Sequence, residues 1–171
     1  MTSATIGVNP VLKGLSSVMK REKFIKKANR WYSYNDETIL VVSIHSAYGN
    51  LKFVNFAIWI KKLADDEYLS ERKKYGINPE YPRENHCHIR FNLSASLPEN
   101  KIEILQKLEN INNTEFTDIE REKITVKLVE QYGMPLLKRC STIKGIVEVI
   151  NEENLKAALM YWKVKELGKI L

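Results

Sequence analysis

The chain has 171 residues, of which 44% are apolar and 28% are charged, a composition typical of a globular protein with its own apolar core. No apolar segment follows Met1 and no run of about 18 apolar residues occurs, so we expect neither a cleaved signal peptide nor a membrane span. Cys87 and Cys140 are the only cysteines. They are too few for a disulfide framework, which favours a reducing, cytoplasmic setting.

The net charge of +6 is concentrated at the beginning of the sequence. Residues 1–30 hold seven basic residues and one acidic residue, whereas the remaining chain carries 20 of each. A basic segment can attract nucleic acid or an acidic partner, but it can equally be the solvated face of a helix. Because neither interleaved aromatic residues nor a nucleic-acid motif accompanies this segment, we favour the solvated face.

Residues 1–25 predict one helix. Asn9 is a suitable N-cap and Pro10 a suitable first helical residue. Apolar residues then recur at three- and four-residue spacing, which predicts one buried stripe. The chain is expected to turn into a sheet near Phe24 and Ile25.

Residues 26–97 predict an antiparallel sheet of about four strands that follow one another as a meander. Four segments in this range are rich in β-branched and aromatic residues and are separated by turn-forming residues. The polar connection before the last of them is expected to contain one short helix over Asp65–Lys74. The four predicted strands are Ala28–Tyr34, Thr38–Ser46, Leu51–Ile60 and Cys87–Leu97.

Residues 98–171 are predicted to form helices. Thr117 and Glu120 match a capping box, which begins a helix expected to end at Gly133 as its C′ residue. A further helix is expected over Thr142–Ile150, and a last one from Asn151 to Gly168. The whole chain, residues 1–171, is therefore expected to be a single α+β domain with helices packed on one face of the sheet.

Alternation of side chains along the strands gives the predicted sheet two different faces. One face is strictly apolar, which predicts that it lies under the helices; it carries Val42, Phe56, Ile58, Ile89 and Phe91. We call the other the mixed face. It carries all three histidines of the chain, and its apolar members are Ile39, Val41, Phe53, Ala57 and Trp59. Its polar members are Ser43, His45, Asn55, His86, His88, Arg90 and Asn92.

The mixed face is the candidate binding site, with His45, Asn55, Trp59, His86, His88 and Arg90 as its residues. Imidazoles can act as acid–base groups or ligands, and Arg90 can anchor an anion. A zinc site made by the three histidines is one alternative, although the face carries no carboxylate to support it. An ordinary half-exposed sheet face is another. We assign no metal, no cofactor and no catalytic residue, and we expect Cys87 to be a buried thiol on the apolar face.

Several motifs carry a resemblance to a known family. They are Lys23-Phe24-Ile25-Lys26-Lys27, Trp31-Tyr32-Ser33-Tyr34, the strand segments around Val42 and Phe56, and Cys87-His88-Ile89-Arg90. In these motifs the chain resembles a bacterial family known as domain of unknown function 4304, over roughly residues 8–150. The resemblance implies no activity, cofactor or partner.

The function that these features favour is an intracellular module that binds another protein through the mixed face, as an immunity-like or adaptor protein does. Two alternatives remain open. One is a small enzyme that uses His86, His88 and Arg90 on an anionic substrate, and the other is nucleic-acid binding through the basic N-terminal helix. A flat patch with Trp59 and Phe53 exposed would favour a protein partner, whereas a deep pocket converging on the histidines would favour the enzyme.

Overall fold

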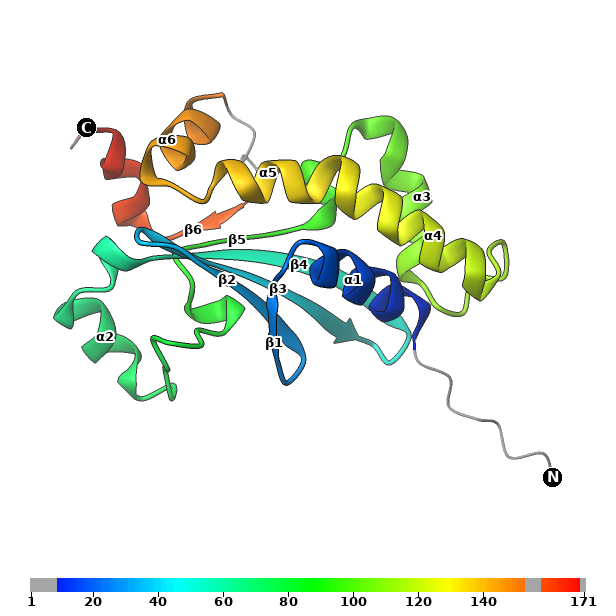
Figure 1. Cartoon of the computed structure of the whole chain (residues 1–171), viewed down its shortest axis with the longest axis horizontal. Coiled ribbons are helices and arrows are strands. Elements are labelled where there is room, and N and C mark those ends of the chain that lie inside the picture. Colours follow the sequence, from blue (N-terminus) through cyan, green and yellow to red (C-terminus); the bar gives the residue numbers. More distant parts are fainter. Residues whose placement is uncertain (1–8, 153–157, 170–171) are drawn as a thin grey trace.

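The computed structural model describes residues 9–152 and 158–169 and shows an α+β architecture, with a helical layer on an antiparallel sheet (Figure 1). The strands follow chain order across the sheet, and each is antiparallel to its neighbours. The predicted class is confirmed, but the described residues form six strands because a short strand adds to each edge. The strands are β1 (Ile25–Lys27), β2 (Arg30–Tyr34), β3 (Thr38–Ala47), β4 (Leu51–Ile60), β5 (Ile89–Asn92) and β6 (Leu159–Met160).

The longest pairing in the sheet joins β3 and β4, from Thr38 opposite Ile60 to Ala47 opposite Leu51. The turn between these strands places Tyr48 and Gly49 at positive φ, 50° and 76°. These two residues belong to a three-residue loop, residues 48–50, that connects the paired residues Ala47 and Leu51. Every residue of β3 is paired in a constant register with β4, so the hairpin has no bulge and alternate residues keep to one face along its whole length.

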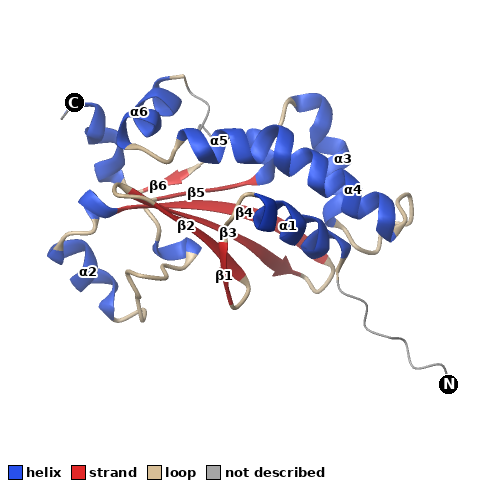
Figure 2. Cartoon of the chain, viewed as in Figure 1, coloured by secondary structure: helices blue, strands red, loops and turns tan. Residues whose placement is uncertain are grey.

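Five of the six α-helices in the described part of the chain cover one face of the sheet (Figure 2). The N-caps follow the sequence: the Asn9 side chain accepts a hydrogen bond from the Leu12 amide. The predicted capping box is confirmed, since the Glu120 amide donates to Thr117 Oγ1 and the Thr117 amide donates to the Glu120 carboxylate. These helices are α1 (Pro10–Arg21), α3 (Ile102–Glu109), α4 (Asp118–Leu128), α5 (Met134–Arg139) and α6 (Ile143–Asn151).

The main core lies between this helical layer and the predicted apolar face. Each of the five residues assigned to that face is at most 5% exposed, as predicted. They pack together with Leu15 and Val18 of α1 and with Leu137 of α5. Burial of apolar area between a sheet and a helical layer is a main source of stability in such a fold. The five residues are Val42, Phe56, Ile58, Ile89 and Phe91.

The prediction that a helix ends at Gly133 is wrong. A π-helical turn over Val129–Gly133 connects α4 to α5, and Gly133 keeps a helical φ of −65°. A Cβ atom at this position would lie 2.5 Å from the Phe56 ring. The glycine is therefore needed for the close approach of helix and sheet rather than for a left-handed cap.

The predicted helix from Asn151 to Gly168 is also wrong where the structure describes it. Asn151 is the last residue of α6, and residues 153–157 of the predicted helix lie outside the described residues. Beyond them, β6 pairs with β5, and a 3₁₀ helix (η6) covers Trp162–Lys169. The open edge of β5 offers this segment hydrogen-bond partners that override its helical pattern.

The remaining helix, α2 (Asp66–Lys73), lies on the other side of the sheet (Figure 1). It agrees with the short helix predicted over Asp65–Lys74, and Asp65 caps it by accepting a hydrogen bond from the Tyr68 amide. Its position was not expected, because helices were predicted on one face only. None of the helices in the described part of the chain has the length and apolar character needed to cross a lipid bilayer.

Candidate functional site

The mixed face of the sheet is divided into a covered half and an open half. The covered half lies beneath α2 and the connection that follows it, where a second apolar cluster forms. The open half is a polar pocket. The buried residues of this cluster are Tyr32, Ile39, Val41, Ala57, Trp59 and Cys87, together with Tyr68 of α2.

Trp59 belongs to the covered half and is only 2% exposed. Its ring contacts the edge of Tyr68, with 5.6 Å between centroids. The Tyr68 hydroxyl donates a buried hydrogen bond of 2.6 Å to the carbonyl oxygen of His86. Trp59 is therefore a core residue, and the flat exposed patch that we considered for a protein partner does not form around it.

His88 lies on the predicted side of the sheet but is fully buried. Its ring stacks on Tyr68 at 4.2 Å, and its Nδ1 accepts a hydrogen bond of 3.0 Å from the Ile60 amide. Burial lowers the pKa of His88 to about 4, an effect reinforced by Arg72. The imidazole is therefore neutral at pH 7, with its proton on Nε2. Its placement in the candidate site is corrected: it anchors the end of β4 to the aromatic cluster.

His86 is not in a strand but in a short 3₁₀ turn, η2 (Glu84–His86), which crosses the mixed face. It is 3% exposed and lines a separate hollow of about 570 Å³ against α2. Burial lowers its pKa, and the charges of Arg83 and Arg72 add to this effect. The three histidines thus occupy different surroundings. Among the described residues no group of three His, Cys, Asp or Glu side chains is placed to hold a metal ion.

Cys87 is buried, as expected, but it lies in the covered half rather than under the main helical layer. The reason is that β5 begins only at Ile89, so the alternation of the strand does not extend back to Cys87. Burial raises the pKa of Cys87, and burial raises that of Cys140 to about 12. Neither thiol is therefore ionised at neutral pH.

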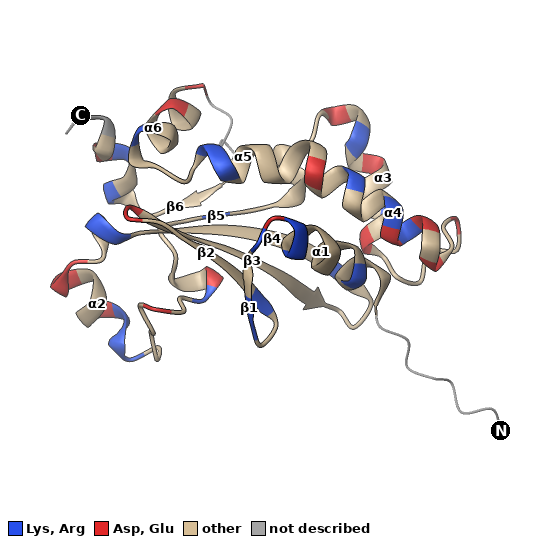
Figure 3. Cartoon of the chain, viewed as in Figure 1, with Lys and Arg blue, Asp and Glu red and all other residues tan. Residues whose placement is uncertain are grey.

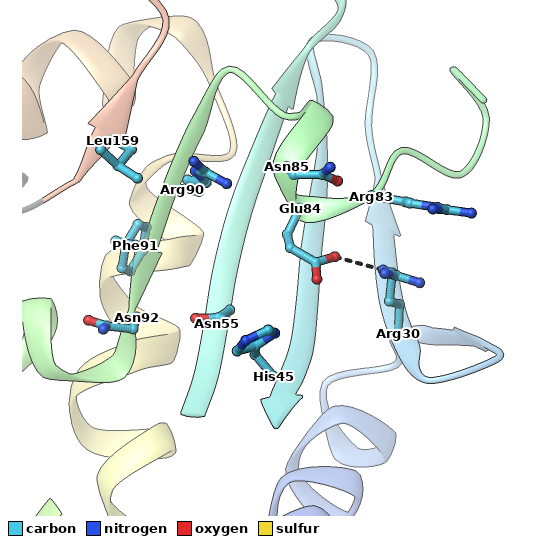
Figure 4. A pocket seen from close by; sticks show the side chains of 10 residues that line it. All are labelled: Arg30, His45, Asn55, Arg83, Glu84, Asn85, Arg90, Phe91, Asn92 and Leu159. Atoms are coloured by element: carbon cyan, nitrogen blue, oxygen red, sulfur yellow. Dashed lines mark hydrogen bonds and ion pairs between the residues drawn. The ribbon is translucent and has the colours of Figure 1, made fainter. Parts of the chain in front are cut away.

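The open half of the mixed face is a polar pocket of about 600 Å³ (Figure 4). Its floor is formed by β3, β4 and β5, and η2 forms the rim toward the covered half. The strand edge at β6 adds an apolar wall. The residues that line the pocket are Arg30, His45, Asn55, Arg83, Glu84, Asn85, Arg90, Phe91, Asn92 and Leu159.

Strand register explains why these side chains meet. Ser43 pairs with Arg30 on one side and with Asn55 on the other, and Asn55 in turn pairs with Asn92. Residues that pair directly across strands project from the same face, so the four form one polar row across β2 to β5. His45 lies two residues from Ser43 on β3, and Arg90 lies two residues from Asn92 on β5, on the opposite side of the row. Asn55 therefore bridges the gap between His45 and Arg90.

An ion pair defines one side of the pocket. Arg30 Nε lies 2.7 Å from Glu84 Oε2, and both side chains are less than one-quarter exposed. Burial would raise the pKa of Glu84, but the hydrogen bond and charge of Arg30 outweigh it and hold this pKa below its ordinary value. Figure 4 shows the Glu84 carboxylate over the floor between Arg30 and His45. Arg30 is thus already occupied by an anionic group.

Arg83 and Arg90 have no such partner. Neither forms an ion pair or a hydrogen bond through its guanidinium with any residue that the structure describes, and both are exposed. They lie on opposite sides of the pocket (Figure 4). With three arginines and one glutamate in its lining, the pocket attracts negatively charged groups.

The structure thus brings together three of the predicted site residues, His45, Asn55 and Arg90, and buries the other three elsewhere. Sequence reasoning missed Arg30 and Glu84 among others. Arg30 could have been found, because it alternates with Tyr32 and Tyr34 toward the mixed face. Glu84 could not, since a long connection without periodicity carries it to the pocket.

Two basic residues of the N-terminal helix are neutralised by carboxylates of α4 and of the π-helical turn that follows it (Figure 3). Lys13 pairs with Glu122 at 2.7 Å, and Arg21 pairs with Glu130. Glu22, the one acidic residue of the segment, pairs with Lys138 on α5 at 2.6 Å. This face of α1 is therefore packed against carboxylates, which weakens the interpretation of α1 as a nucleic-acid surface.

A family model described as "Domain of unknown function (DUF4304)" matches residues 15–139, as the resemblance in the sequence predicted. The match contains every residue of the polar pocket except Leu159. Neither a curated protein nor a solved structure matches the chain.

Proposed function

This chain belongs to the DUF4304 family, and we propose that it is an adaptor-like module that binds an acidic segment of a partner protein in the polar pocket. The observation that carries the proposal is the pair of exposed guanidinium groups, Arg83 and Arg90, without an anionic partner in a concave site. Guanidinium groups recognise carboxylates through two parallel hydrogen bonds, and they do so best where water is partly excluded.

The remaining lining residues suit a polypeptide ligand. The carboxamides of Asn55 and Asn92 each offer a donor and an acceptor, as a peptide backbone requires. Leu159, which is 61% exposed, provides apolar area beside them. An acidic side chain can thus be paired while its backbone is hydrogen-bonded and its flanks lose water.

The enzyme alternative has less support. The enzyme that we considered needs His86 and His88 in the pocket, and both are buried outside it. The hydroxyl of Ser43, which lies in the polar row, is buried and therefore not available to a substrate.

We place the docking event inside the cell, because Cys87 and Cys140 are both free thiols and a reducing compartment keeps them so.

The proposal is tested with an eight-residue peptide, acetylated and amidated at its ends, in which four residues are aspartate. A second peptide carries asparagine at the same positions. We expect the aspartate peptide to bind in fluorescence anisotropy, with an affinity that falls as salt is added, and the asparagine peptide to bind at least tenfold more weakly.

The variant Arg90→Gln should reduce the affinity for the aspartate peptide at least fivefold while leaving the melting temperature unchanged. Arg139→Gln is the matched control: Arg139 is also a partly exposed arginine but lies on α5, where it pairs with Glu152. Its affinity should stay within twofold of the unmodified protein. Equal binding of both peptides, or no effect of Arg90→Gln, would contradict the proposal.

A further inference from the structure

A second hollow adjoins the polar pocket on the side of β1 and β2. It has a volume of about 220 Å³ and shares Arg30 and Arg83 with the pocket. We call it the basic hollow, because its lining adds Lys27 and contains no acidic residue. Tyr32, Asn78 and Tyr81 form most of the rest of its wall. The two concave sites therefore adjoin each other at two arginines.

Register shows how the basic hollow is placed relative to the pocket. Lys27 pairs with Arg30, so the polar row continues onto β1 and runs across five strands as Lys27, Arg30, Ser43, Asn55 and Asn92. Adjacent strands lie about 4.8 Å apart, so the four steps from Lys27 to Asn92 span roughly 19 Å. A ligand that follows the row lies across the strands rather than along them.

Positive charge flanks both ends of this row, because Lys27 is its last member on β1 and Arg90 lies two residues from Asn92 on β5. Lys27 is exposed, and its ammonium group lies 3.1 Å from the centroid of the Tyr81 ring. Arg83 extends to the β2 side of the pocket, away from Arg90 (Figure 4). Between the two ends, Arg30 already forms an ion pair with Glu84. Two separated places for an anion result, one at Arg90 and one at Lys27 and Arg83.

We propose that the acidic segment carries two acidic side chains about five residues apart, one bound in the polar pocket and one in the basic hollow. The inference rests on the proposed function and adds the spacing and the second subsite. An extended chain advances about 3.4 Å per residue, so five residues cover most of the roughly 19 Å row. Two tethered contacts raise affinity because the second binds at high effective concentration.

The lining favours a polypeptide over a single-stranded nucleic acid. Nucleic acid without sequence preference binds by stacking its bases on open aromatic faces. In the basic hollow, Lys27 covers a face of Tyr81, and the Tyr32 ring meets Tyr81 edge to face at 5.6 Å. Tyr32 is itself 3% exposed. The aromatic rings of this hollow are therefore engaged with the protein.

The test uses three end-blocked peptides of ten residues built from serine and alanine. One contains a single aspartate, one contains two adjacent aspartates, and one contains two aspartates separated by four residues. We expect the spaced peptide to bind at least tenfold more tightly than the single-aspartate peptide, and the adjacent pair to gain less than threefold. A thymidine octanucleotide is measured beside them.

The variant Lys27→Gln should remove the advantage of the spaced peptide while leaving the affinity for the single-aspartate peptide within twofold. Lys127→Gln is the matched control, because Lys127 is an exposed lysine on α4; it should retain the full advantage. Thermal melting establishes that both variants are folded.

The outcomes separate this inference from the proposed function. If the single-aspartate peptide binds in a manner that requires Arg90 but spacing has no effect, the two-subsite inference is wrong and the proposed function stands. If Lys27→Gln retains the spacing advantage, the basic hollow is not the second subsite. If no acidic peptide binds, both proposals fail. Binding of the octanucleotide at least as tight as that of the spaced peptide would overturn the inference in favour of nucleic acid.

Discussion

The covered and open halves of the mixed face are built on the same strands but have opposite character. In the covered half, Trp59 and Val41 lie under α2 in an aromatic cluster, where His88 accepts a buried hydrogen bond. In the open half, Asn55 and Arg90 stand on the neighbouring rungs of the same strands and line a pocket. Alternation along a strand thus decides which face a side chain occupies, whereas the segment packed above it decides whether that side chain is structural or available to a ligand.

The segment that divides the two halves is the connection between β4 and β5. Tyr68 of α2 is fully buried and fixes the helix over Trp59 and His88. The turn η2 then crosses the sheet and presents Glu84 to the pocket while burying His86. One continuous segment therefore closes one half and completes the other, and each half can be perturbed separately.

The largest expected difference concerns stability. Trp59→Ala removes a fully packed indole from the covered half and should lower the free energy of unfolding by about 3–5 kcal/mol. Asn55 lies on the same strand and the same face but in the open half, so Asn55→Ala should cost less than about 0.5 kcal/mol. Urea denaturation measures both. Similar losses for the two variants would show that the open half is as tightly packed as the covered half.

The second prediction concerns pH. The pKa of His88 in the folded protein is about 4, whereas an unfolded histidine titrates near 6.5. As the pH falls, the unfolded chain therefore binds this proton first. The contribution of His88 to stability is fully present above about pH 6.5, declines from there to about pH 4, and amounts to about 3 kcal/mol.

His88→Gln should remove that part of the pH dependence. The measurement compares the urea midpoint of the variant with that of the unmodified protein between pH 7.5 and pH 4.5. His45→Gln is the control in the open half, where the histidine is exposed. A parallel pH dependence for His88→Gln and the unmodified protein would place the titrating group elsewhere.

A smaller effect is expected from two tyrosine hydroxyls that both donate to backbone carbonyls. Tyr68→Phe leaves the buried carbonyl of His86 without its partner and should cost about 1–3 kcal/mol. Tyr34→Phe removes an exposed hydrogen bond to Glu80 and should cost less than about 0.5 kcal/mol. The comparison is made by thermal melting at fixed pH. Equal losses would mean that α2 does not exclude water from the covered half.

A small loss of stability, together with a gain in binding affinity, is expected from Glu84→Gln. The ion pair with Arg30 is partly exposed, so its loss should cost less than about 1 kcal/mol. Because Arg30 is then free for a ligand, the affinity for the four-aspartate peptide should rise at least threefold. Glu130→Gln, which frees Arg21 on α1, should leave that affinity unchanged. A lower affinity of Glu84→Gln would indicate that Glu84 is needed to position Arg30.

Much of the fold followed from local patterns. The range of β4, Leu51–Ile60, and the capping box at Thr117 were both readable from the sequence, because alternation and capping depend on neighbours in the chain. Gly133 was misjudged, since its role arises from contact with Phe56 on a distant strand. The edge strand β6 was missed because pairing with β5 overrides a helical pattern.

In the candidate site, too, local patterns were predictable from the sequence and distant contacts were not. Alternation placed His45, Asn55 and Arg90 on one face, and the structure brings them to one pocket. It also placed His88 and Trp59 on that face but could not show that α2 covers them. Glu84 and Arg83 reach the pocket from a connection with no periodicity, so only the tertiary structure reveals the ion pair with Arg30 and the positive charge beside it.

The most direct test of the division is nuclear magnetic resonance with the four-aspartate peptide as the ligand. Side-chain signals report both halves in one spectrum: the carboxamides of Asn55 and Asn92 and the Nε–H of Arg90 in the open half, and the indole N–H of Trp59 in the covered half. We predict saturable shifts of the three open-half signals while the indole signal of Trp59 stays in place. Shifts confined to Trp59, or no shifts at saturating peptide, would contradict the assignment of the polar pocket as the binding site.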